Sequence, residues 1–106
     1  NKADCVLQLL HAGAHPDQPG EYGRRPLHYA SKRGHIDCMR HLLDNNANPN
    51  QLDLSGKTPL HYAIEMGHIN CMRHLLNSKA NPNQLGKDEM TLLCYATNEN
   101  KADCVL

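Results

Sequence analysis

The chain of 106 residues has no phenylalanine and no tryptophan, and its four tyrosines are the only aromatic residues apart from histidine. Its core must therefore be built from Leu, Ile, Met, Ala and Cys. The formal net charge at pH 7 is zero, which argues against a partner that is a nucleic acid or an anionic membrane. No apolar run approaches the roughly 20 residues of a membrane-spanning helix. The first residues, NKADCVLQLL, also lack a secretory pattern.

What the sequence does contain is one passage written twice. Residues 24–56 read RRPLHYASKRGHIDCMRHLLDNNANPNQLDLSG, and residues 57–89 read KTPLHYAIEMGHINCMRHLLNSKANPNQLGKDE. At this offset of 33 residues, 20 of the 33 positions are identical. Self-similarity at a fixed period of this length is typical of a solenoid, in which each unit packs on its neighbours.

The number of cysteines, five, is odd, and four of them are spaced 33 residues apart: Cys5, Cys38, Cys71 and Cys104. Equivalent positions in stacked units lie roughly 10 Å apart, the spacing of packed helices. A disulfide needs Cα atoms within about 7 Å. We therefore expect these cysteines to be reduced, buried and packed as small apolar residues. Their reduced state predicts an intracellular location, in the cytoplasm or nucleus.

Within each unit the sequence predicts two helices and a loop. In the second full unit, Thr58 is a good N-cap and Pro59 suits the first helical turn. Gly67 is expected to end this first helix. The second helix of each unit carries an apolar stripe and ends in a left-handed residue, for which Asn46 is well suited in the first full unit. Lys79 takes this position in the next unit, where we expect strain and a looser corner.

The string TPLHYAIEMGHINCMRHLLNSKANPN resembles the ankyrin repeat family. The Thr-Pro-Leu-His-x-Ala string, the Gly-His, the Leu-Leu pair and the Ala-Asn-Pro-Asn all stand at the family's places in its 33-residue unit. The resemblance covers the whole chain and implies an all-α solenoid of stacked helix-turn-helix units with projecting hairpin loops. On this basis we expect a single domain, 1–106, made of a half repeat (1–23), two repeats (24–56 and 57–89) and a degenerate, truncated repeat (90–106).

The resemblance also implies a function, that of a non-catalytic scaffold that binds a protein or peptide. In the family, the hairpin tips and the first helices line a concave face on which partners dock. Mapped residue by residue, this face comprises Glu21, Tyr22, Arg24, Lys32 and Arg33 in the first unit, Leu54, Ser55, Lys57, Glu65 and Met66 in the second, and Lys87, Asp88, Met90, Asn98 and Glu99 in the third. The family's hairpin aspartate is present as Asp53 but replaced by Gly20 and Gly86.

Basic residues cluster in the first unit at Arg24, Arg25, Lys32 and Arg33. They are either an anchor for an acidic or phosphorylated peptide, with bidentate arginine contacts and Tyr22 as a packing surface, or a solvated face. One short basic patch on a neutral chain is less than nucleic-acid binding requires. We therefore expect neither a nucleic-acid partner nor a membrane partner.

Eight histidines invite a metal interpretation, but the repeat argues against it. His28 and His61 are equivalent and thus roughly 10 Å apart, whereas two nitrogens on one zinc ion lie about 3.3 Å apart. The resemblance implies instead that both form structural hydrogen bonds between repeats. Cys94 stands at the same position in the third unit, where a small filling residue is a simpler explanation than a reactive thiol. We expect no metal, no cofactor and no catalytic residues.

One feature goes beyond the resemblance, because residues 1–7 and 100–106 are both NKADCVL. The offset is 99 residues, three units of 33. The chain is then one period of a longer array, a permuted or engineered chain, or a chain whose copies continue one another end to end. Both ends fall inside a helix pair and lack a polar cap, so we expect exposed apolar surface and head-to-tail self-association. The alternative function is therefore a structural tile of a repeat array.

Overall fold

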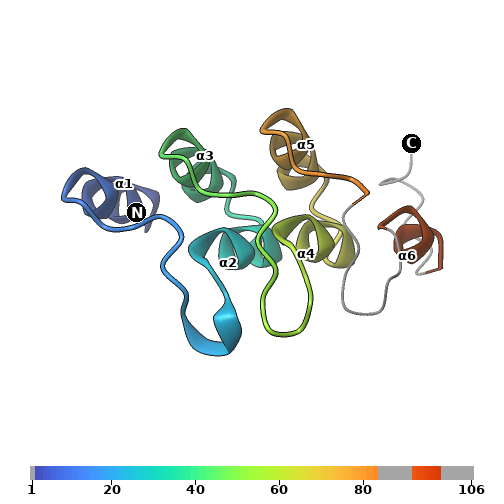
Figure 1. The fold of residues 1–106 in the computed structure, drawn as a ribbon. Helices are drawn as coiled ribbons and strands as arrows, with labels where there is room; N and C mark the ends of the chain where they lie inside the picture. Colours follow the sequence, from blue (N-terminus) through green and yellow to red (C-terminus); the bar gives the residue numbers. More distant parts are fainter. Residues whose placement is uncertain (1, 84–91, 99–106) are drawn as a thin grey trace.

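The computed structural model describes residues 2–83 and 92–98, and its helices stand in two parallel rows (Figure 1). One row holds the first helices of successive units, α2 (Pro26–Arg33), α4 (Pro59–Glu65) and α6 (Leu92–Asn98). The other holds the second helices, α1 (Lys2–His11), α3 (Ile36–Asp44) and α5 (Ile69–Asn77). Neighbours pack along each row, and α2 packs on α3 as α4 does on α5. The all-α solenoid predicted from the repeat is confirmed.

The first helices α2 and α4 each begin with a proline, followed two residues later by a histidine that closes the first turn. Thr58 precedes Pro59, and its hydroxyl oxygen accepts a hydrogen bond of 3.3 Å from the His61 N–H, as expected of an N-cap. The backbone N–H of Thr58 in turn donates to Nδ1 of His61, at 3.1 Å. In α2, the N–H of Arg25 donates to Nδ1 of His28, at 2.9 Å. The histidine thus closes the first turn as a glutamate does in a capping box.

The helix ends follow the predicted left-handed positions. Gly67 has a φ of 71° after α4, and Asn46 has a φ of 70° after α3. Lys79 adopts a φ of 72° at the equivalent corner after α5, which confirms the left-handed backbone expected there. The corner is nevertheless closed as well as its counterpart. The N–H of Ala80 donates to the Leu75 carbonyl at 2.9 Å, against 3.0 Å from Ala47 to Leu42, so these bonds do not show the expected loosening.

The core fills the space between the rows with aliphatic and sulfur-containing side chains, the most deeply buried of which include Leu27, Met39, Leu60, Ala63, Cys71 and Leu75. The prediction for the cysteines holds only in part. Cys5, Cys38 and Cys71 are free thiols, but only Cys71 is buried, Cys38 is half-buried and Cys5 is exposed. Cys5 is exposed because it lies on α1, the end helix of its row, which packs on α3 and has no buried residue of its own. Cys104 lies outside the described residues.

The loops that follow the second helices are tied from unit to unit. The backbone N–H of Asn48 donates to both carboxylate oxygens of Asp17, and each oxygen lies 3.1 Å from the nitrogen. One unit later, the side-chain oxygen of Asn50 accepts from the N–H of Asn81 at 2.7 Å. Asp17 and Asn50 are equivalent positions, as are Asn48 and Asn81, so the same tie occurs twice.

Candidate functional site: the face of fingers and first helices

Two loops project from the helical rows and lie side by side (Figure 1). We call residues 18–25 the first finger and residues 51–58 the second finger. Each is closed by a backbone hydrogen bond, from Gly20 to the Arg24 carbonyl at 2.7 Å and from Asp53 to the Lys57 carbonyl at 2.9 Å. The tips are joined because the N–H of Leu54 donates to the carbonyl of Tyr22 at 2.9 Å. The fingers therefore present one continuous edge.

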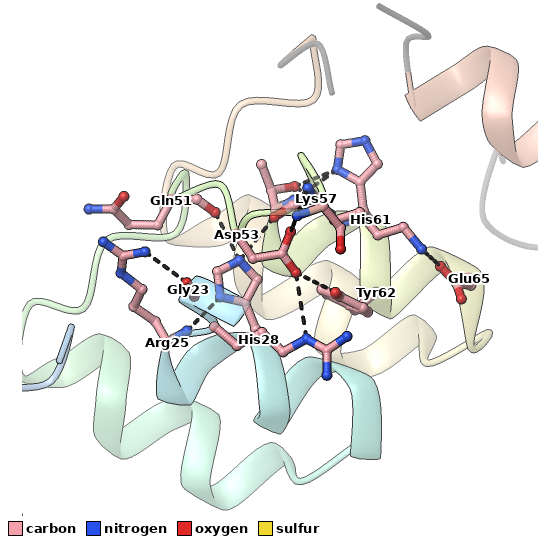
Figure 2. Close-up of polar contacts among 12 residues, drawn as sticks. Gly23, Arg25, His28, Gln51, Asp53, Lys57, His61, Tyr62 and Glu65 are labelled. Carbon is pink, nitrogen blue, oxygen red and sulfur yellow. Dashed lines mark hydrogen bonds and ion pairs between the residues drawn. The ribbon is translucent and has the colours of Figure 1, made fainter. Parts of the chain in front are cut away.

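Asp53 organises the second finger from inside (Figure 2). Its Oδ1 accepts hydrogen bonds from the N–H groups of Ser55 and Lys57, at 2.9 and 3.0 Å, and its Oδ2 accepts one from the Tyr62 hydroxyl. Burial alone would raise the pKa of the Asp53 carboxyl, but the bonds from Tyr62, Lys57 and Ser55 outweigh it and lower this pKa. Burial and the same bond to Asp53 raise the pKa of Tyr62 to about 12. Asp53 is therefore ionised and Tyr62 protonated at neutral pH.

His28 joins the first unit to the second finger, as the resemblance implied. The ring is buried, and its Nε2 lies 3.0 Å from the carbonyl oxygens of both Gln51 and Lys57. Because Nδ1 accepts from the N–H of Arg25, the Nε2–H is the donor to these carbonyls. Burial lowers the pKa of His28, which keeps the ring neutral in this role. Its partners are in Figure 2.

Three cations surround the ring of Tyr62. Nζ of Lys57 lies 5.4 Å from the ring centroid, Cζ of Arg24 lies 5.8 Å away and Nζ of Lys32 lies 6.0 Å away. We call these three residues the Tyr62 cation cluster. Lys57 also forms an ion pair of 2.8 Å with Glu65 (Figure 2). The Arg24 guanidinium reaches a second ring, with its Cζ 5.4 Å from the centroid of Tyr22.

The structure brings together most of the residues predicted for the concave face in the first two units. Glu21 and Tyr22 lie in the short 3-10 helix η1 (Glu21–Gly23) at the tip of the first finger. Leu54 and Ser55 form the tip of the second, next to the Tyr62 cation cluster, and Met66 follows α4 with an exposed side chain. Arg24 and Arg33 also line a groove between α1 and α2. Lys87 and Asp88, with Met90 and Glu99, lie outside the described residues, as does the side chain of Asn98. The binding role of these residues remains a prediction.

Sequence reasoning missed the central residue, Tyr62. The repeat makes it equivalent to Tyr29, yet Tyr62 is 3% exposed and Tyr29 is 38% exposed. Tyr62 is covered by His28, Arg24 and Lys32 of the preceding unit, whereas Tyr29 lines the groove beside α1 and α2. In addition, Asp53 stands nine residues before Tyr62, whereas Gly20 stands nine residues before Tyr29. An aspartate and a tyrosine at this spacing were the signal that would have identified the buried pair.

In the described ranges 2–83 and 92–98, no group of three or more His, Cys, Asp or Glu side chains is placed to hold a metal ion. None of the helices in this part of the chain has the length and apolar character needed to cross a membrane.

Comparison with known proteins identifies the family. The family model described as ankyrin repeats (3 copies) matches residues 1–86. No curated protein matches the chain. Since the match covers most of the sequence, the chain belongs to the ankyrin repeat family. Ankyrin repeats are generally protein–protein interaction modules and are typically non-catalytic.

Proposed function

We propose that this chain is a non-catalytic scaffold that binds a partner protein or peptide across its fingers and first helices. The observation that carries the proposal is the juxtaposition of exposed apolar fingertips with the Tyr62 cation cluster. Tyr22 is 59% exposed and Leu54 is 74% exposed, and the backbones of the two residues are hydrogen bonded to each other. Tyrosine and arginine are enriched among the residues that dominate binding energies at protein interfaces.

The charge of this face supports an acidic partner. Lys32 and Arg33 end α2, and Arg24 and Lys57 enter from the two fingers. Complementary charge of this kind speeds association and selects between partners more than it adds affinity. The charge belongs to this face and not to the chain as a whole, whose formal net charge is zero.

The test compares two charge-reversed double variants in quantitative affinity capture. Lys32→Glu with Arg33→Glu reverses two cations on the proposed face. Arg73→Glu with Lys79→Glu makes the same change of charge at exposed positions on α5 and at its end. We expect at least one partner to be captured equally by the wild type and the second variant. The first variant should capture at least about tenfold less of that partner. Partners lost equally from both variants would contradict the assignment to this face.

A second candidate, head-to-tail association of copies, is supported by a groove of about 640 Å³ beside α1 and α2. Its lining is mainly apolar and includes Val6, Pro26, Tyr29, Ala30, Cys38 and Leu42. A helix in this groove would contact α1 and α2 as α2 contacts α3 and α4. The repeat of residues 1–7 at 100–106 places α6 just ahead of a copy of the α1 sequence. In this candidate, α6 of a second copy occupies the groove.

Sedimentation velocity over a concentration series, in reducing buffer, tests the second candidate. We expect the sedimentation coefficient to rise with concentration if copies stack. Tyr29→Glu, which places a charge in the groove, should abolish the rise. Tyr22→Glu, the same substitution at a fingertip, should leave it unchanged. A wild-type coefficient that does not change with concentration would exclude the stacking.

A further inference from the structure

The geometry points to the Tyr62 cation cluster as a binding site for one carboxylate of an acidic peptide, an inference that rests on the proposed function. The cluster draws its cations from three separate segments. Arg24 comes from the first finger, Lys32 from the last turn of α2 and Lys57 from the second finger. All three lie within 6.0 Å of one ring centroid.

The carboxylates around the cluster do not balance its charge. Glu65 is the ion-pair partner of Lys57. Asp53 lies 3.7 Å from Nε of Arg24, but its two oxygens already accept hydrogen bonds from Tyr62, Ser55 and Lys57. Lys32 has no carboxylate partner among the residues that the structure describes. The cluster therefore holds one positive charge in excess.

Arg24 supplies a second sign of an incomplete site. Its Nε is buried and has no hydrogen-bond partner in the described part of the chain. The facing Asp53 oxygen is too distant for a hydrogen bond. A buried donor without a partner is unfavourable, and so are three cations that share one ring. The tyrosine ring attracts each cation but cannot remove their mutual repulsion.

A single carboxylate fits these observations better than a dianion. One excess positive charge is matched by one negative charge, and the ammonium of Lys32 is the donor left to bind it. The site is partly screened from water, since the side chains of Arg24 and Lys57 are 25% and 36% exposed. Charge-assisted hydrogen bonds are stronger than neutral ones, more so out of bulk water.

The exposed residues beside the cluster indicate which side chains should flank the carboxylate in the ligand. Tyr22 stacks on Arg24 and remains 59% exposed, and Leu54 lies beside it on the second fingertip. A peptide with a glutamate or aspartate on the cluster would therefore place a neighbouring apolar side chain against the fingertips. The ligand class is an acidic peptide segment with flanking apolar residues.

The test is an NMR titration of the whole chain with three capped pentapeptides, acetyl-Leu-Gly-X-Gly-Leu-amide, where X is glutamate, glutamine or phosphoserine. We expect the glutamate peptide to shift the Arg24 side-chain N–H and the amides of both fingers. The glutamine peptide should bind at least about tenfold more weakly. Lys32→Gln should lower the affinity for the glutamate peptide about tenfold, Lys32→Arg should retain it, and Lys79→Gln, an equal charge change elsewhere, should leave it unchanged.

Three outcomes would overturn the inference. They are equal binding of the glutamate and glutamine peptides, no effect of Lys32→Gln, and binding of the phosphoserine peptide alone, which would assign the site to a phosphoryl group. If the peptides fail while a captured partner still depends on Lys32 and Arg33, only the carboxylate site falls. If no partner depends on the face either, the proposed function falls as well.

Discussion

Asp53 accepts three hydrogen bonds from the second finger and α4, whereas Gly20 at the equivalent position offers no side chain to the first finger. The first finger is held instead by backbone hydrogen bonds and by Nη1 of Arg25, which donates to the carbonyl of Gly23 at 2.8 Å. Asp53 also gives the buried Tyr62 hydroxyl its hydrogen-bond partner, which Gly20 could not provide for Tyr29. One substitution in the repeat therefore changes both how a finger is held and whether the following tyrosine has a carboxylate partner.

Tyr62→Phe should destabilise the chain by about 2 kcal/mol, because it removes a hydrogen bond to a buried carboxylate. Tyr29→Phe is the matched control at the equivalent, exposed position and should change stability by less than about 0.5 kcal/mol. Urea unfolding followed by circular dichroism measures both. Equal effects of the two substitutions would show that the Asp53–Tyr62 bond contributes little.

The buried histidines should make stability depend on pH. Burial lowers the pKa values of His28 and His61 from the ordinary 6.5, so protonation favours the unfolded chain. Their contribution is present above the unfolded pKa and is lost as the pH falls from there through the lower folded pKa. Stability should therefore decrease between pH 7.5 and 5.5.

The pH prediction is checked by urea unfolding at both pH values. His28→Gln should be less stable overall. It should also lose less stability on acidification, because one of the two buried histidines is gone. His11→Gln, at an exposed position in α1, should keep the wild-type dependence. A stability that does not change between pH 7.5 and 5.5 would contradict this account.

At the scale of the helices, local signals decided what could be predicted. Thr58 and Pro59 begin α4 and Gly67 follows its end, because capping and backbone preferences depend on a few neighbouring residues. Burial depends on which helices pack nearby, so Cys5 was wrongly expected to be buried on α1. The position of Lys32 near Tyr62 is likewise a contact between units, and the repeat pattern carries no information about it.

The corner after α5 offers a stabilising substitution. Lys79 has a φ of 72°, a conformation that glycine adopts without the steric cost that other residues incur. Lys79→Gly should raise the free energy of unfolding by about 1 kcal/mol, and Asn46→Gly at the equivalent corner should gain less, because asparagine tolerates this conformation. Thermal unfolding of the two variants makes the comparison. A loss of stability in Lys79→Gly would show that the lysine side chain contributes more than its backbone costs.

At the scale of the whole molecule, cohesion comes from contacts between neighbouring units. Helices of neighbouring units pack on each other, α1 on α3, α2 on α4 and α3 on α5. The hydrogen bonds between Asp17 and Asn48 and between Asn50 and Asn81 link the same neighbouring units. Stability in such a chain is approximately a sum of unit terms and nearest-neighbour terms. The proposed binding face also depends on contacts between neighbouring units, because the Tyr62 cation cluster is assembled across the boundary between two units.

The ties between successive loops also bear on how the chain would respond to a pulling force. Each tie links one loop to the next, so a load applied at the two ends would pass from unit to unit through the ties and the helix contacts. Units would give way one after another, and each would lengthen the chain by roughly 100 Å, since an extended residue spans about 3.3 Å. The molecule would extend in steps under tension and would recover one unit at a time when the tension is released.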